Sequence, residues 1–190
     1  MSPELWSIVG AIVAAALIIA MGYNRLVTFR QAVNTSWSNI DTELQRRHDL
    51  VPNLVEITRA GAVHERRTQE AVARARGAAM LSRAAERVSA ESMLIDEVRQ
   101  LLLLTEAYPE LKAQQGFTDL QRALVRSEDR IQAARRLHNN NVQSYNRRIQ
   151  TFPLLVLAKL TGFRAASYLD FDRAIDEVPE IRGALGRHER

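Results

Sequence analysis

The sequence of 190 residues contains no cysteine and only two lysines, Lys112 and Lys159. The lack of cysteine excludes disulfide bonds and thiolate chemistry. Arginine therefore carries almost all of the positive charge, and the formal net charge is +4. Such mild basicity fits a protein beside an anionic membrane surface as well as one beside nucleic acid.

Charge is also missing from residues 5–23, LWSIVGAIVAAALIIAMGY. A helix of this length spans about 28 Å, close to the ~30 Å hydrocarbon core of a bilayer. A core helix of a globular domain would need a polar side, which this stretch lacks. We therefore predict a transmembrane anchor in residues 1–23. A cleaved signal peptide is the alternative, but no basic residue precedes Glu4.

Basic residues flank this stretch on one side only. No lysine or arginine precedes it, whereas Arg25 and Arg30 follow it. The positive-inside rule then predicts that the N-terminus lies outside and that the C-terminal domain lies in the cytoplasm.

No segment alternates apolar and polar residues with a period of two, so we predict an all-α protein. Apolar residues instead recur every seven residues, as in the helices of a bundle. The first such run continues through Pro52, which favours one long helix kinked at this proline, with a turn as the alternative. Its positions are Leu26, Val33, Ile40, Arg47, Leu54 and Gly61, with Trp37, Leu44 and Val51 beside them.

A second long helix is predicted toward the C-terminus, where Thr118 and Gln121 form a capping-box pattern at its start. Its heptad positions are Phe117, Leu124, Ile131, His138, Tyr145 and Phe152, with Glu128, Arg135, Val142 and Ile149 beside them. Residues 92–107 predict another helix, after a turn within residues 77–92. The apolar segment from Pro153 predicts the fourth bundle helix, or alternatively a membrane-dipping segment. Residues 169–190 are expected to form a loosely held tail.

Motifs for catalysis or metal binding are lacking. The sequence has no G-x-S-x-G, no P-loop and no G-x-G-x-x-G. His64 begins an H-E-x-x-H-like pattern, but Thr68 occupies the place of the second histidine. On one continuous helix His48 and His64 would face nearly opposite directions. We therefore predict no catalytic residue, no metal site and no cofactor.

Two groups of polar residues are candidates for an interaction surface or for packing. Arg46, Asp49, Asn53 and Glu56 lie on one side of the first helix. Such a stripe is most often solvated or forms salt bridges between helices, and we predict that it is an interaction surface.

Arg47, Glu128, Arg135 and His138 occupy heptad positions that are otherwise apolar. We predict that they form a buried polar layer, with Arg47 and Glu128 as the pair. The alternative is that these side chains reach water at the edge of the core.

Arginine is concentrated in two stretches. Residues 59–87 contain seven arginines and three acidic residues, and residues 122–148 contain seven arginines and two acidic residues. A nucleic-acid surface would combine such charge with exposed aromatic residues or a known recognition motif, and neither stretch does. We favour a solvated helix face, which could also contact anionic lipid. A nucleic-acid-binding membrane protein is the alternative function.

Several separated motifs resemble the LemA family over residues 5–180. They are YNRLV, SWSNIDTELQRRHDLVPNLVE, ARARGAA, LTEAYPELKA, FTDLQRALVRSEDRIQAARR and YNRRIQTFP. One departure is His138-Asn139, where the family tends to have Tyr-Asn, as at Tyr145-Asn146.

The resemblance implies a single membrane anchor, placed in the bacterial inner membrane, followed by an antiparallel up-and-down four-helix bundle over residues 24–168. The family has no established enzymatic activity or cofactor, so the resemblance implies neither for this chain. Some relatives take part in forming bacterial organelle membranes, which implies a scaffold, adaptor or self-assembling protein that contacts protein partners or copies of itself.

Overall fold

The computed structural model describes residues 3–60 and 66–169, and within these ranges the chain is helical with no strand. This confirms the predicted all-α class. The helices are α1 (Pro3–Ala60), α2 (Arg66–Leu81), α3 (Ala84–Leu104), η1 (Thr105–Ala107), α4 (Pro109–Lys112), α5 (Gln115–Ile149) and α6 (Leu154–Thr161).

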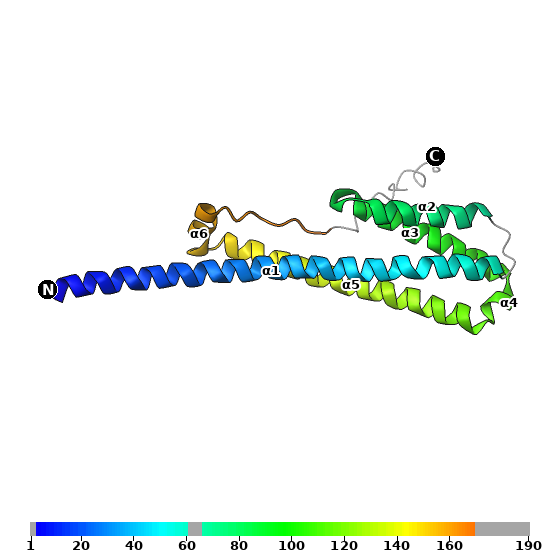
Figure 1. Ribbon diagram of the computed structural model, residues 1–190, viewed down its shortest axis with the longest axis horizontal. Coiled ribbons are helices and arrows are strands. Elements are labelled where there is room, and N and C mark those ends of the chain that lie inside the picture. The colour runs from blue at the N-terminus through cyan, green and yellow to red at the C-terminus, as the bar shows by residue number, and fades with distance from the viewer. Residues whose placement is uncertain (1–2, 61–65, 170–190) are drawn as a thin grey trace, which may run out of the picture.

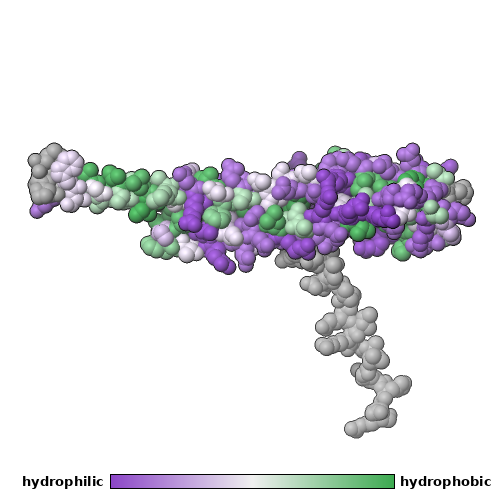
Figure 2. Space-filling view, turned by 90° about the horizontal axis from the view of Figure 1, so that it is seen from below, coloured by the Kyte–Doolittle hydropathy of each residue, from purple (hydrophilic) through white to green (hydrophobic). Residues whose placement is uncertain are grey.

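Helix α1 dominates the shape of the molecule (Figure 1). It has 58 residues, which corresponds to a length of about 87 Å. Its N-terminal part projects beyond the other helices, and the most apolar 18-residue window there has a mean hydropathy of 2.1 with none of it buried. Figure 2 shows this part as a hydrophobic rod attached to a largely hydrophilic body. By length and composition it is a candidate membrane-spanning helix.

The first helix stays helical through Pro52, so the alternative of a turn at this residue is wrong. The helical conformation survives because the proline removes only one backbone hydrogen bond while the helix is held from both sides by packing. A kink at Pro52 stays a prediction. The last position of the first heptad run, Gly61, lies outside the described residues, and so does His64.

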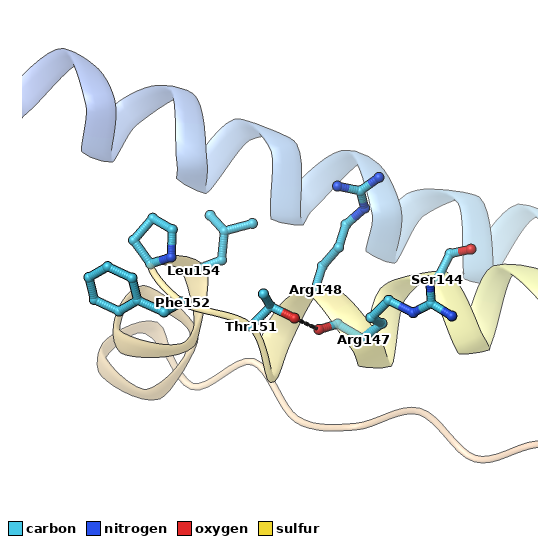
Figure 3. Close-up of a pocket in the computed structure, with 7 residues that line it drawn as sticks. Ser144, Arg147, Arg148, Thr151, Phe152 and Leu154 are labelled. Atoms are coloured by element: carbon cyan, nitrogen blue, oxygen red, sulfur yellow. Dashed lines mark hydrogen bonds between the residues drawn. The ribbon is translucent and has the colours of Figure 1, made fainter.

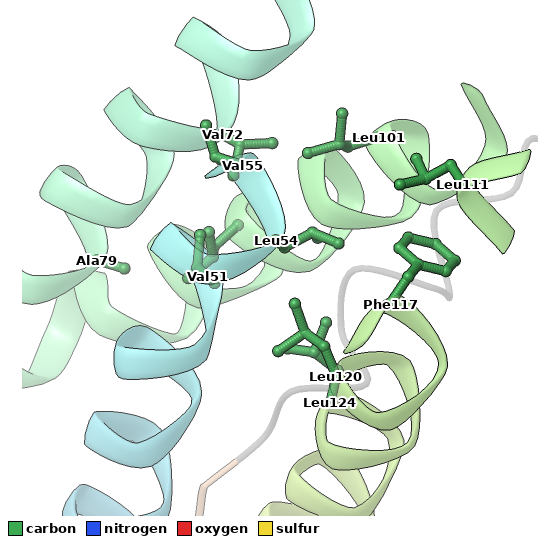
Figure 4. Close-up of a cluster of buried hydrophobic side chains, with 11 residues drawn as sticks. Val51, Leu54, Val55, Val72, Ala79, Leu101, Leu111, Phe117, Leu120 and Leu124 are labelled. Carbon is green, nitrogen blue, oxygen red and sulfur yellow. The ribbon is translucent and has the colours of Figure 1, made fainter. Parts of the chain in front are cut away.

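Helices α1 and α5 run antiparallel and supply most of the core. Their heptad residues meet in three clusters along the rod. The cluster beside the apolar stretch contains Leu26, Val33, Val142, Tyr145, Ile149 and Ala158. The middle cluster contains Ile40, Leu44 and Ile131. The far cluster contains Val51, Leu54, Val55, Val72, Ala79, Leu94, Leu101, Leu111, Phe117, Leu120 and Leu124 (Figure 4).

Helices α2 and α3 form a hairpin that packs on the distal half of α1 (Figure 1). The prediction placed the fourth long helix at the apolar segment after Pro153, but α6 has only eight residues and ends at Gly162 with φ of 74°. Residues 66–81 form the additional helix α2, which the heptad pattern does not predict. A turn at Ser82 and Arg83 separates it from α3, within the predicted range.

Two expected features of α5 are wrong. The helix begins at Gln115 rather than at Thr118. It ends at Ile149, so Phe152 lies beyond it and is 79% exposed instead of buried. After α6 the chain runs as an extended segment, residues 163–169, back along the bundle (Figure 1). The expected tail from residue 170 onward lies outside the described residues.

Candidate functional site

A cluster of ionisable side chains is buried where α1, α3 and α5 meet. Glu91 of α3 is fully buried, and both of its carboxylate oxygens bind residues of α1. Arg47 Nη2 donates to Glu91 Oε2, and His48 Nε2 lies 2.9 Å from Glu91 Oε1. The other end of the Arg47 guanidinium, Nη1, donates to Glu128 Oε2 of α5 at 3.1 Å. One arginine thus connects three helices.

Glu91 is ionised in this environment. Burial by itself would raise the pKa of its carboxyl group, because a charge is poorly solvated there. The hydrogen bond from His48 and the positive charge of Arg47 outweigh burial, and the pKa lies below its ordinary value. Since Glu91 has no exposed surface and His48 is only 1% exposed, substrate could not reach them. The cluster is suited to holding helices together.

Pro52 creates a second polar contact between helices. A proline has no N–H, so the carbonyl oxygen of His48, four residues earlier, has no partner within α1. Arg76 of α2 supplies one, because its Nε donates to this oxygen at 2.7 Å. Pro52 of the motif RRHDLVPNLVE therefore leaves one backbone carbonyl oxygen without a donor, and Arg76 of the motif ARARGAA supplies that donor.

We expect Arg76→Met to lower the free energy of unfolding by about 1–3 kcal/mol, because it leaves the His48 carbonyl buried without a donor. In a Pro52→Ala background the N–H of residue 52 can donate to the His48 carbonyl, so Arg76→Met should lower the free energy of unfolding much less. Urea unfolding of the four proteins measures the coupling. Arg74→Met, an exposed arginine on the same helix, is the control. Equal losses in both backgrounds would contradict the link.

His138 occupies a separate polar position nearer to the apolar stretch. Ser36 donates its hydroxyl proton to the Val33 carbonyl at 2.8 Å. The Nδ1 atom of His138, 3.0 Å from Ser36 Oγ, must then be the donor in that contact. The ring also meets the edge of Trp37, with centroids 5.6 Å apart. Burial lowers the pKa of His138, so the folded protein favours the neutral imidazole, and the contribution of His138 to the stability of the fold decreases as the pH falls below 6.5.

The structure thus brings together some of the predicted polar layer. Arg47 and Glu128 are in contact, whereas His138 lies apart with Ser36. Arg135 is partly buried. The layer is therefore divided between two places, which alternate with the three apolar clusters along α1 and α5.

The predicted stripe lies on the solvent side of α1. Arg46, Asp49, Asn53 and Glu56 are all exposed. Their contacts stay within the helix: Arg46 Nη1 is 3.6 Å from Glu43 Oε2, and Gln45 Nε2 donates to Asp49 Oδ1 at 2.8 Å. No other helix of the described chain covers these four side chains. The stripe is available to a partner.

Two asparagines one heptad apart hold the extended segment onto α5. Asn146 donates to the carbonyl of Ala166 and accepts from its N–H, both at 2.9 Å. Asn139 makes the same pair of bonds to Leu169, at 3.0 and 2.9 Å. Tyr145 adds a bond from its hydroxyl to the Arg164 carbonyl at 2.9 Å. The repeated aromatic-Asn pattern therefore serves as a pair of backbone clamps.

Glu91, Arg76 and the two clamping asparagines are not among the residues that the sequence patterns indicate. Glu91 lies in a stretch where no heptad pattern was visible, so nothing in the spacing marked it as buried. Arg76 had one signal that could have found it: a proline inside a helix demands a donor from elsewhere. Among the residues that the structure describes, no group of three or more His, Asp or Glu side chains could hold a metal ion.

The sequence model of the LemA family matches residues 36–182. The chain belongs to the LemA family. Within it, the chain is similar to two proteins named magnetosome proteins MamQ 1 and MamQ 2 of Paramagnetospirillum magneticum, with 25% identity to each over 92% of this chain and 74% of the relative.

A third relative is the magnetosome protein MamQ of Magnetospirillum gryphiswaldense. It is 25% identical over 83% of this chain and 68% of its own length. Every structural feature described above lies within the part that matches the LemA family, except the apolar stretch and the first turns of α1 after it.

Proposed function

We propose that this LemA-family chain is a single-pass protein of the bacterial inner membrane whose domain acts as a scaffold, adaptor or self-assembling membrane-organising factor, without catalysis. The observation that carries the proposal is the continuity of α1 from the exposed apolar stretch into the core of the domain. A continuous helix fixes the distance of the polar stripe from the membrane. At 1.5 Å per residue, residues 46–56 lie about 35–50 Å beyond the end of the apolar stretch.

The domain fold that we propose is an antiparallel up-and-down four-helix bundle of α1, α2, α3 and α5. The support is the direction of the chain, which reverses at each connection between these helices (Figure 1). The short α2–α3 hairpin would complete the bundle over the distal half of α1. Buried ion pairs between helices favour one defined arrangement, because the charges are satisfied in that arrangement alone.

The domain would face the cytoplasm, because Arg25 and Arg30 follow the apolar stretch and no basic residue precedes it. The relatives named magnetosome proteins support a role in a membrane system of bacteria.

A nucleic-acid surface is less well supported, because several arginines of the two arginine-rich stretches already have internal partners. Arg76 binds a backbone carbonyl, Arg87 Nη1 lies 2.7 Å from Asp41 Oδ1, and Arg122 Nη1 lies 3.1 Å from Asp119 Oδ1. These guanidinium groups already have partners within the protein.

The proposal predicts that the full-length chain, extracted in a mild detergent, is a multimer or carries a bound protein. Mass photometry followed by protein mass spectrometry measures both. A variant with Arg46, Asp49 and Glu56 replaced by serine should lose the association, while a variant with Arg122, Arg126 and Asp129 replaced by serine on exposed positions of α5 should keep it. A wild-type chain that is monomeric and free of protein partners would contradict the proposal.

A further inference from the structure

The charge of the domain is divided sharply along its length. Residues 5–40 and 131–169 contain eight arginines and lysines and no aspartate or glutamate. Residues 41–130 contain 14 basic and 15 acidic residues. The two segments without acidic residues belong to the antiparallel parts of α1 and α5 and to α6, at the end beside the apolar stretch (Figure 1). Within the part of the chain that the structure describes, that end of the molecule has unbalanced positive charge.

Helix α6 lies against α1 where the apolar stretch ends. A Cβ atom added at Gly22 would come within 3.1 Å of Leu154 Cδ2 and 3.3 Å of Leu157 Cδ2. The ring of Tyr23 meets the edge of Phe163, with centroids 5.9 Å apart. If residues 5–23 cross the bilayer, these contacts place α6 at the level of the headgroups.

One side of the α6 region is apolar and uncovered. Phe152 and Leu160 are each 79% exposed, and Val156 between them is 50% exposed. Val156 and Leu160 are four apart and therefore lie on one side of α6, while Phe152 lies in the turn just before this helix. The other side of α6 packs into the cluster beside the apolar stretch through Leu154, Leu157 and Ala158. Figure 2 shows hydrophobic surface at this end of the body, next to the apolar part of α1.

A cavity of about 370 Å³ lies at the corner between α5 and α6 (Figure 3). Arg147, Arg148, Ser144 and Phe152 are among the residues that line it. The guanidinium of Arg148 is held 3.9 Å from the centre of the Phe29 ring. Within the described residues neither Arg147 nor Arg148 has a carboxylate at salt-bridge distance. Arg147 and Arg148 follow one another in α5, and their side chains leave the helix in different directions at this corner (Figure 3). Guanidinium groups without carboxylates suit phosphate groups, which arginine binds through several N–H donors.

We propose that this corner binds the anionic headgroup of a membrane phospholipid. Arg147 and Arg148 contact the phosphate, and Phe152, Val156 and Leu160 enter the boundary between headgroups and acyl chains. The lipid belongs to the leaflet from which α1 emerges, because the corner continues directly from the apolar stretch. The inference rests on the proposed membrane anchoring and adds to it a specific site and a class of ligand.

The first test uses full-length protein in nanodiscs of mixed phosphatidylcholine and phosphatidylglycerol. Lipid that remains bound after detergent exchange is quantified by mass spectrometry. Wild-type protein should retain phosphatidylglycerol at about fivefold or more above its bulk share. The double variant Arg147→Gln and Arg148→Gln should retain the two lipids in the bulk ratio. The matched double variant Arg122→Gln and Arg126→Gln, on the distal half of α5, should behave like wild type. Equal enrichment in all three proteins would overturn the site.

The second test uses the lack of native cysteine. A fluorophore on Val156→Cys should be quenched by lipids that carry a quencher near the headgroup, whereas a fluorophore on Val125→Cys should not. Val125 is also exposed, at 58%, but lies on the distal half of α5. If the chain inserts into the discs and neither position is quenched, the α6 site is wrong while the anchoring stands. A chain that does not insert into the discs at all would overturn both.

Discussion

Glu91→Gln is expected to lower the free energy of unfolding by about 3–5 kcal/mol, because it removes the negative charge that Arg47 Nη2 and His48 Nε2 contact in the protein interior. Glutamine keeps the size of the side chain and one acceptor, so the loss reports mainly the charge. Urea unfolding followed by circular dichroism measures the change. Glu86→Gln, at an exposed position of the same helix, should change stability by about 0.5 kcal/mol or less.

A second substitution, at Arg47, tests whether the loss of stability comes from the uncompensated buried charge. Removing Arg47 as well, by Arg47→Met, should restore part of the lost stability, because the buried positive charge is then no longer uncompensated. Glu128, whose side chain is 35% exposed, can be solvated without Arg47. A double variant whose loss equals the sum of the two single losses would show that the three groups are not coupled.

Acid should remove the contribution of Glu91. Because its pKa is lowered from 4.5 in the folded protein, the ionised carboxylate stabilises the fold at all higher pH values. This stabilisation is lost as the pH falls below about 4.5 and through the folded pKa. The difference in stability between wild type and Glu91→Gln should therefore be constant above pH 5.5 or so and shrink in acid.

The second large effect is expected at the asparagine clamps. Replacing both Asn139 and Asn146 by alanine removes four hydrogen bonds that hold the segment 163–169. Each bond contributes about 0.5–1.5 kcal/mol. The population of the locally open form should therefore rise by about 30-fold or more. Trypsin cleavage after Arg164, which is exposed within this segment, measures the opening, since cleavage follows the population of the open form.

The control for the clamps is Asn140→Ala, which removes an exposed asparagine between them. It should leave the rate of cleavage after Arg164 unchanged. If the double variant is cleaved no faster than this control, the two asparagines do not hold the segment.

The long helices could be predicted because their signal is repetitive. Each heptad position in α1 and α5 adds independent support for the same helix face, and most of these residues are buried in the three clusters. The heptad pattern on both sides of Pro52 outweighs this single unfavourable residue, so the pattern predicts one helix that continues through it.

Short elements and contacts with α3 could not be predicted in this way. Residues 154–161 are apolar enough for a core helix, but Gly162 ends the helix after two turns and the segment packs only at one end of α1. Phe152 continued the heptad spacing although the helix ends before it, because periodicity does not report where a helix stops. Glu91 is buried by its partners on α1, and the sequence of α3 alone contains no sign of them.

The central claim is that the stripe on α1 contacts another protein at a fixed distance from the membrane. The most direct measurement is photocrosslinking in living cells with a crosslinking amino acid at Asn53, and with the same amino acid at Gln121, an exposed position of α5. We predict one discrete crosslinked product at Asn53, either a dimer of this chain or a complex with one recurrent membrane protein, and none at Gln121. The absence of a product at Asn53, with the protein present in the membrane, would contradict the claim.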